Sequence, residues 1–191
     1  MTTMSMGQSE GTWSLSTRVI VYAAIGAALY AAAGYYSYFA QIPGTEGVYL
    51  RPAYGVLTFF GFAFGPVVGL FTGLVGNALA DTFTGYGTFT SWHWSIANGL
   101  VALVAGLLAA GAARGMRGGT RALFSIVVAE IATVIGFLFI WIELVTQPEL
   151  GSQVILWSEY VPTVVSNAIF AAVLTPILVL AWDPVAERLG R

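Results

Sequence analysis

The sequence predicts an all-α integral membrane protein, built as a bundle of six transmembrane helices. Hydrophobic residues make up 58% of the 191 residues, and charged residues only 8%. A soluble domain carries about 25% charged residues, so this chain has too few charges to cover a surface that faces water. Its mean hydropathy of +0.81 agrees with a membrane location.

Apolar segments separated by polar, glycine- or proline-containing breaks define the six helices. A spanning helix needs roughly 20 apolar residues. One long apolar block is divided at Gly65 and Pro66, because glycine suits the end of a helix and proline the first turn of the next. The predicted helices cover residues 18–39, 52–64, 66–83, 94–113, 122–145 and 160–182. The chain then consists of a flexible cytoplasmic N-terminus (1–17), a six-helix membrane domain (18–183) and a cytoplasmic C-terminal tail (184–191).

The arginines predict the orientation of the bundle, because cytoplasmic loops carry an excess of basic residues. With the N-terminus inside, only Arg51 lies outside the cell. The other six arginines then face the cytoplasm: Arg18, Arg114, Arg117, Arg121, Arg188 and Arg191. An even number of helices also places both termini in the cytoplasm. The polar N-terminal segment lacks the pattern of a signal peptide, so we expect the first helix to stay in the membrane.

Several kinds of chemistry are excluded or disfavoured by composition. The absence of cysteine excludes disulfides, thiolate metal sites and cysteine nucleophiles. The chain has no lysine and no phosphate-binding GxxxxGK[ST] motif, so it does not hydrolyse ATP by itself. The only histidine, His93, has no partner at a metal-ligand spacing. We therefore expect no metal, no cofactor and no enzymatic activity, and the net charge of −2 argues against nucleic acid as a partner.

Small residues recur every four positions along the first helix. They form two stripes, Ala23/Ala27/Ala31 and Ala24/Ala28/Ala32. Such a stripe lets another helix approach closely, because lipid supplies no hydrophobic drive for helix association and tight packing must supply it. The stripes indicate either packing inside the bundle or docking of a separate membrane protein.

Polar residues inside the membrane are costly and suggest function. Glu130 lies near the centre of the fifth predicted helix and Glu143 near its outer end. Their separation turns them well apart around the helix, so we do not expect one carboxylate pair. Asn77, Asn98 and Asn167 lie in spans, where asparagine often only joins helices, and Asp81 can cap a neighbouring turn.

His93 lies between Trp92 and Trp94 at the outer start of the fourth helix. Tryptophans at this depth usually form the aromatic belt of a membrane protein. The alternative is an aromatic cage in which a flat ligand stacks.

Several segments together resemble a known family. They are Ala24–Tyr30, Leu50–Tyr54, Phe64–Leu70, Gly73–Asp81 and the stretch from Tyr86 to Val101. In order and spacing they resemble the substrate-binding S components of energy-coupling factor (ECF) transporters, above all the riboflavin or hydroxymethylpyrimidine type. The likeness covers about residues 20–110, and the rest follows the helix pattern. Asn77 stands where this branch tends to have histidine, and the acidic residues of the fifth helix match no family motif.

The resemblance implies a six-helix bundle that binds a vitamin from outside and works with a membrane T component and two ATPases. In that family small alanines on the first helix contact the T component. Here these are the pair Ala23 and Ala27 or the pair Ala24 and Ala28. The family's outer loop after the first helix acts as a lid, which corresponds to residues 40–51.

The expected ligand is a small aromatic vitamin or precursor, of the riboflavin or the thiamine/hydroxymethylpyrimidine type. A flat heterocycle needs apolar faces for stacking and a few directed polar groups. The predicted site contains Trp92, Trp94, Tyr54 and Tyr86 for stacking, His93, Asn98, Glu143 and Asn167 as polar groups, and Arg51 on the lid. A carboxylate suits an aminopyrimidine or a thiazolium cation, whereas riboflavin relies more on stacking and amide contacts.

Two other classes of function stay open. A stand-alone carrier coupled to protons or ions could use Glu130, although no internal repeat of the kind common in carriers is evident. A membrane-embedded enzyme could use Glu130 or Asp81 with His93, but these residues are expected at different depths.

Overall fold

The fold is given by a computed structural model, which describes residues 13, 15–45, 47–146 and 148–189. Most of the predicted N-terminal segment and the last two residues of the predicted tail lie outside the described residues. Among the six arginines assigned to the cytoplasmic side, Arg191 therefore has no structural description.

The described chain is mostly helical, which confirms the all-α part of the predicted fold class. Its elements are α1 (Thr17–Ser37), α2 (Ala53–Phe64), α3 (Pro66–Thr84), α4 (Trp92–Ala112), α5 (Gly118–Leu138), α6 (Ile140–Thr146), the 3₁₀ turn η1 (Pro148–Leu150), α7 (Ser152–Val154), the π-helical turn η2 (Ile155–Tyr160) and α8 (Val161–Arg188). In these residues the only β-type pairing is an isolated bridge between Gln41 and Tyr49.

Five helical stretches within the described residues are long and apolar enough to cross a membrane: Thr17–Ser37, Pro66–Thr84, Trp92–Ala112, Gly118–Thr146 and Ser152–Arg188. The apolar helix α2 has 12 residues and is shorter than a full span. Each of the six predicted helices corresponds to one of these segments. Two differ in extent: the fifth is interrupted at Phe139, which separates α5 from α6, and the last continues past Asp183 to Arg188.

The turn between α2 and α3 forms as predicted. Gly65 has a φ of 97°, a left-handed conformation that L side chains rarely adopt, and Pro66 is the first residue of α3. The chain therefore changes direction between α2 and α3 with a single residue, Gly65, between the two helices.

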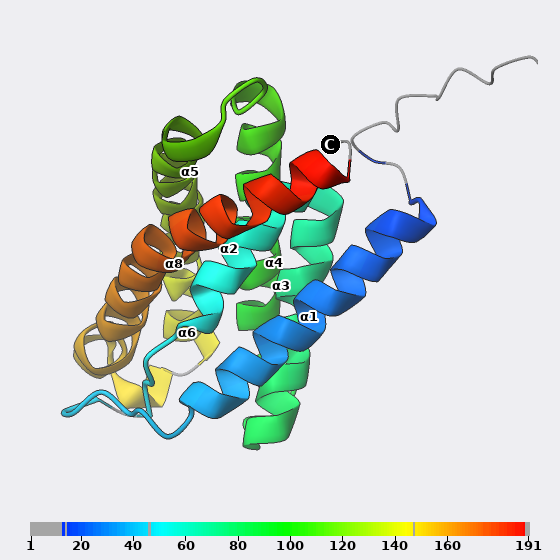
Figure 1. The fold of residues 1–191 in the computed structure, drawn as a ribbon. Helices are drawn as coiled ribbons and strands as arrows, with labels where there is room; N and C mark the ends of the chain where they lie inside the picture. Colours follow the sequence, from blue (N-terminus) through cyan, green and yellow to red (C-terminus); the bar gives the residue numbers. More distant parts are fainter. Residues whose placement is uncertain (1–12, 14, 46, 147, 190–191) are drawn as a thin grey trace, which may run out of the picture.

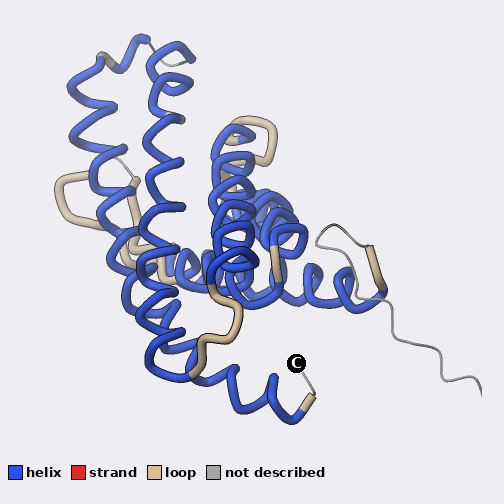
Figure 2. Tube along the Cα trace, turned by 90° about the horizontal axis from the view of Figure 1, so that it is seen from above, coloured by secondary structure: helices blue, strands red, loops and turns tan. Residues whose placement is uncertain are grey.

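The helices pack so that α3 contacts α1 and α4, while α8 contacts α5 and α2 (Figures 1 and 2). The α3–α4 contact is especially close, because Gly69 and Gly73 face the backbone carbonyls of Ala102 and Asn98. A side chain at either glycine would collide with the backbone of α4. Small residues thus allow the close helix approach that is typical of membrane bundles.

The bundle has two different ends (Figure 1). The start of α1, the α4–α5 turn and the end of α8 lie at one end, which we call the arginine-rich end because it contains Arg18, Arg114, Arg117, Arg121 and Arg188. The loop of residues 38–52 after α1 and the connection between α5 and α8 lie at the other, which we call the loop-covered end. The two described chain ends therefore share a side, and the cytoplasmic assignment of that side remains a prediction.

Candidate functional site

Three polar and aromatic side chains from two distant segments of the sequence meet at the loop-covered end. His93 and Trp94 come from the first turn of α4, and Glu143 comes from α6. His93 Nε2 lies 2.5 Å from Glu143 Oε1, and Trp94 Nε1 donates a hydrogen bond of 2.6 Å to the same oxygen. The turn at Phe139 makes this possible, because it begins a separate helix from which Glu143 reaches α4.

This cluster is buried, which is unusual for groups that can carry charge. Only 5% of the His93 side chain and 1% of the Glu143 side chain are exposed. The Glu143 carboxyl also lies close to the carboxyl of Glu159 in η2. Glu143 thus joins a histidine, an indole and a second acid in one network, and such networks carry a large penalty if a member is lost.

Arg51 connects this cluster to the loop above it. Its guanidinium carbon lies 5.8 Å from the centre of the Trp94 ring, within the range of a cation–π contact. Its backbone N–H donates a 3.0 Å hydrogen bond to Ser166 Oγ on α8. Arg51 forms no ion pair with any residue in the described part of the chain. Its charge is therefore available to a ligand.

The loop of residues 38–52 is folded over the end of the bundle. The rings of Tyr38 and Tyr49 stack with their centres 4.6 Å apart, and Tyr86 OH donates a 2.9 Å hydrogen bond to the carbonyl of Gly47. Burial raises the pKa of the Tyr86 phenol, which keeps its proton available for this bond. The hydrogen bond between Tyr38 and Tyr49 likewise raises the pKa of Tyr38.

A small cavity of about 60 Å³ lies under this loop. Its polar lining includes Tyr30, Tyr38, Tyr49, Arg51, Asn77, Asp81 and Tyr86. Asp81 and Arg51 bring opposite charges to it from α3 and from the loop, and no ion pair between them forms in the described chain. The cavity therefore presents a hydrogen-bond acceptor, a donor and several aromatic faces.

Asn77 organises the floor of this cavity. Its amide nitrogen donates to Asp81 Oδ2 at 2.7 Å and to Ser95 Oγ at 3.1 Å. Its amide oxygen accepts from Asn98 Nδ2 at 2.8 Å and from Tyr30 OH at 3.2 Å. An asparagine side chain has two donors and two acceptor positions, so Asn77 is fully satisfied within the protein. Its role is to hold α1, α3 and α4 together and to orient Asp81.

The structure brings most of the predicted site residues to the loop-covered end, but it divides them between two places. Trp94, His93, Glu143 and Arg51 form the buried cluster. Tyr86 and Arg51 line the cavity, and Asn98 belongs to the Asn77 network.

Three predicted residues lie apart from both places. The Trp92 side chain is 48% exposed and lines an apolar groove between α3 and α4 on the outside of the bundle. Tyr54 is buried in the core of the bundle. Asn167 is only 5% exposed, and its amide oxygen has no hydrogen-bond partner among the described residues.

Sequence reasoning left several cavity and cluster residues out of the predicted site. They are Tyr30, Tyr38, Tyr49, Asn77, Asp81 and Glu159. The spacing of four residues between Asn77 and Asp81 places them on one helix face, so that pair was detectable from the sequence. The contact between Glu143 and Glu159 depends on the connection between α6 and η2, which no local pattern reveals.

The two alanine stripes of α1 have different surroundings. Ala23, Ala27 and Ala31 are buried, and the carbonyl of Ala27 lies against Gly76 of α3. Ala24, Ala28 and Ala32 are exposed. The first stripe is therefore buried against α3, although Ala23 and Ala27 also line an apolar groove between α1 and α3, and the second stripe is the more exposed of the two.

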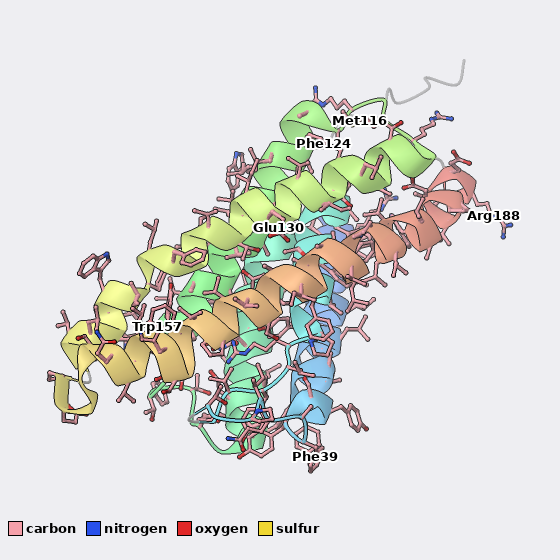
Figure 3. The ribbon with its side chains drawn as sticks, turned by 90° about the vertical axis from the view of Figure 1, so that its left-hand side faces the viewer. Phe39, Met116, Phe124, Glu130, Trp157 and Arg188 are labelled. Atoms are coloured by element: carbon pink, nitrogen blue, oxygen red, sulfur yellow. The ribbon has the colours of Figure 1, made fainter. Side chains whose placement is uncertain are left out.

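Glu130 lies midway along α5, where this helix passes α8 (Figure 3). Its Oε1 atom is buried and has no hydrogen-bond partner among the described residues. It is separate from the cluster around Glu143. Because a carboxyl is costly to place at membrane depth, Glu130, with its Oε1 unpartnered within the described structure, is a candidate functional residue.

Comparison with known proteins relates most of the chain to one family. The family model described as "ECF-type riboflavin transporter, S component" matches residues 14–183. A UPF0397 protein of Streptococcus pneumoniae (strain CGSP14) is 39% identical over 88 residues, which is 46% of this chain and 46% of that protein. The chain thus spans about half the length of this curated relative. No solved structure matches the chain.

Proposed function

We propose a function on one premise: the chain belongs to the family of ECF-type riboflavin transporter S components. It is therefore a membrane substrate-binding subunit rather than an enzyme, and a multi-pass protein of the plasma membrane. Our proposal is that it captures a small aromatic vitamin or precursor from outside the cell. Riboflavin and the thiamine/hydroxymethylpyrimidine type are the two leading choices.

The observation that carries this proposal is the arrangement of Arg51, Trp94 and Glu143. The loop residue Arg51 lies over the Trp94 ring, and that ring donates its N–H to the buried carboxyl of Glu143. A flat heterocycle that replaces Arg51 over the indole would gain a stacking face, while Arg51 and Asp81 would supply a donor and an acceptor at its edge. Polar groups that converge on an aromatic face are typical of sites for such ligands.

Ligand entry requires the loop to move. The cavity under the loop measures about 60 Å³, whereas sites for small organic ligands usually measure about 300–1,000 Å³. The loop is attached to the neighbouring elements by few side-chain hydrogen bonds, among them Tyr86 to Gly47 and Arg51 to Ser166. We propose that the structure represents the closed form, and that breaking these bonds opens the site to the outside.

The proposed partners are an ECF T component and two ATPases. The chain has no phosphate-binding motif for ATP, so the energy for release of the ligand must come from other subunits. The exposed stripe of Ala24, Ala28 and Ala32 on α1 is the surface that we assign to the T component. Its small side chains allow a partner helix to approach closely.

The direct test is to identify the ligand. The chain is purified with mild detergent, its bound small molecules are extracted, and these are identified by mass spectrometry. We expect a stoichiometric flavin, thiamine or pyrimidine compound. A ligand without an aromatic ring, retained at equal molar ratio, would contradict the proposed substrate class.

A second candidate function is a stand-alone carrier coupled to protons or ions. The observation that favours it is the unpartnered, buried Oε1 atom of Glu130 in the middle of α5. Purified chain reconstituted alone in liposomes separates the two functions. Vitamin accumulation driven by a proton gradient, and lost in Glu130→Gln, would favour the carrier. Accumulation only with the T component and ATPases present, and retained in Glu130→Gln, would favour the S component.

A further inference from the structure

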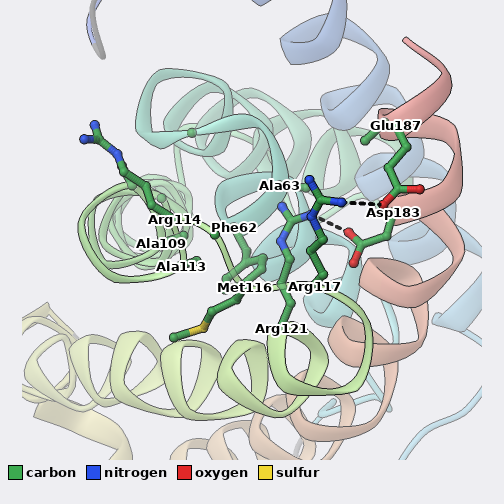
Figure 4. A pocket seen from close by; sticks show the side chains of 15 residues that line it. Phe62, Ala63, Ala109, Ala113, Arg114, Met116, Arg117, Arg121, Asp183 and Glu187 are labelled. Atoms are coloured by element: carbon green, nitrogen blue, oxygen red, sulfur yellow. Dashed lines mark hydrogen bonds and ion pairs between the residues drawn. The ribbon is translucent and has the colours of Figure 1, made fainter. Parts of the chain in front are cut away.

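A second, larger cavity opens at the arginine-rich end of the described structure. Its volume is about 420 Å³, and it lies between α2, α4, α5 and α8 (Figure 4). It is separated from the loop-covered site by the length of the bundle and has no role in the proposed capture of a vitamin. Its volume lies within the range of sites that hold small organic groups.

One wall of this cavity is charged. Arg117 and Arg121 lie next to each other and face Asp183 and Glu187 of α8 (Figure 4). Arg121 pairs with Asp183, which also accepts a 3.3 Å hydrogen bond from the backbone N–H of Gly118. The Arg121 guanidinium lies 5.5 Å from the centre of the Phe62 ring as well. These contacts hold Arg121 at a fixed place in the wall.

The wall carries one more positive than negative charge, because Arg114, Arg117 and Arg121 line it together with two acids, Asp183 and Glu187, and its arginines keep free N–H donors. An arginine has five N–H donors, and Arg121 uses one of them on Asp183 within the described structure. The pair of Arg117 and Glu187 is 3.7 Å long, with 83% and 61% of the two side chains exposed. Such a pair contributes little. Arg114 also lines the cavity and has no acidic partner among the described residues, although its side chain points away from the other arginines (Figure 4).

The other side of the cavity is apolar. Phe62 from α2 and Ala109 from α4 are among the residues that line it. The cavity is at the ends of membrane helices, where lipid headgroups meet the hydrocarbon layer. A soluble anion would use only the charged wall, whereas an amphiphile with an anionic head uses both walls. Basic pockets between membrane helices are known to bind anionic lipid headgroups.

We propose that this cavity binds the headgroup of an anionic phospholipid, with the phosphate held by Arg117 and Arg121 and the glycerol region against the Phe62 and Ala109 side. Arg114 contributes through its charge and adds less than Arg117. The lipid joins the α4–α5 turn to the end of α8 by bridging their charged side chains. This site is independent of the identity of the vitamin.

Native mass spectrometry of the full chain in detergent tests the proposal. The protein is titrated with phosphatidylglycerol, with phosphatidylcholine of the same acyl chains, and with inorganic phosphate alone. We expect one copy of phosphatidylglycerol to bind at least about tenfold more tightly than phosphatidylcholine, because two arginines near a membrane surface each contribute about fivefold or more. Arg117→Gln should weaken binding of phosphatidylglycerol about fivefold, and Arg114→Gln less.

Arg188→Gln is the matched control, because Arg188 is an exposed arginine at the same end that does not line the cavity. It should change the affinity by less than about twofold, as expected for a screened surface charge. Equal affinity for the two lipids would overturn the proposal, as would an equal loss in Arg117→Gln and Arg188→Gln. Inorganic phosphate that binds as tightly as phosphatidylglycerol, and depends on Arg117, would assign the site to a free anion instead.

Discussion

The two ends of the bundle contain polar pairs that differ in exposure: the arginine-rich end combines a mostly buried pair, Arg121 with Asp183, with an exposed one. At the loop-covered end the His93–Glu143 pair is almost completely buried, whereas at the arginine-rich end Arg117 and Glu187 are mostly exposed. Burying groups that can ionise costs desolvation free energy, which is repaid only with excellent geometry and further hydrogen bonds. An exposed ion pair loses little hydration and contributes little to the stability of the fold. We propose that the buried cluster is retained for ligand binding, and that the exposed arginines contribute to orientation and lipid contact.

The largest predicted effect comes from breaking the buried cluster. Glu143→Ala leaves His93 and Trp94 without their shared acceptor and should destabilise the protein by about 3–5 kcal/mol. Arg117→Ala, which removes the exposed pair, should cost less than about 1 kcal/mol. Thermal unfolding of both variants in the same detergent measures the difference. An equal loss of stability in Glu143→Ala and Arg117→Ala would mean that the two ends do not differ in how much their polar pairs contribute.

The second-largest predicted effect distinguishes the two alanine stripes of α1 by what a larger side chain does at each. Ala27→Leu adds volume to a position that is buried against α3 and should cost about 1–3 kcal/mol. Ala28→Leu is one residue away on the exposed face, so it should leave stability nearly unchanged but block assembly with the T component. Unfolding temperature and co-purification of the complex are measured for both. If Ala28→Leu assembles normally, the exposed stripe faces lipid and not the partner.

A smaller effect concerns the loop. Tyr86→Phe removes the hydrogen bond to Gly47, which is worth about 1 kcal/mol, and should speed ligand release about fivefold. Tyr36→Phe is the control, because Tyr36 is on the exposed face of α1. Stopped-flow release of bound vitamin measures both rates. Identical rates would mean that this bond does not hold the loop closed.

The pKa of Tyr86 predicts how the rate of ligand release depends on pH. Because the pKa of Tyr86 is raised above its ordinary value of about 10, the hydrogen bond stays intact at all lower pH values and is lost only as pH rises through the raised pKa. Ligand release from the parent protein should therefore stay unchanged as pH rises through the ordinary tyrosine pKa of about 10, and become faster only at higher pH, near the raised pKa. In Tyr86→Phe the release rate should not change over that range, which is the comparison that identifies the group.

The fold was largely predictable from the sequence because membrane insertion depends on local hydropathy. The Gly65–Pro66 turn was located correctly for the same kind of reason, since the backbone preferences of glycine and proline are local. The break at Phe139 was not predicted, because the residues around it are uniformly apolar and contain no polar or proline break.

The candidate site was only partly predictable, and helix geometry explains much of the difference. Trp92 and Trp94 are two residues apart on α4, so they point to nearly opposite sides of the helix and cannot line one pocket. The two-residue spacing of these tryptophans in the sequence was enough to predict this. The sequence does not distinguish the pair Ala23/Ala27 from the pair Ala24/Ala28. The two stripes are adjacent on α1, and the rotation of that helix about its axis decides which stripe meets α3. The meeting of His93 with Glu143, 50 residues later, depends on tertiary structure alone.

The central claim is that an aromatic vitamin binds at the loop-covered end, on the Trp94 ring beside Glu143 and Arg51. Its most direct test is a binding titration of riboflavin, thiamine and hydroxymethylpyrimidine with the parent protein, Trp94→Ala and Trp157→Ala. Trp157 is 62% exposed and serves as the control. We predict that one vitamin binds the parent and Trp157→Ala equally and binds Trp94→Ala at least several-fold more weakly, because a lost stacking partner costs about 1 kcal/mol or more. Unchanged affinity in Trp94→Ala for every vitamin that the parent binds would contradict the claim.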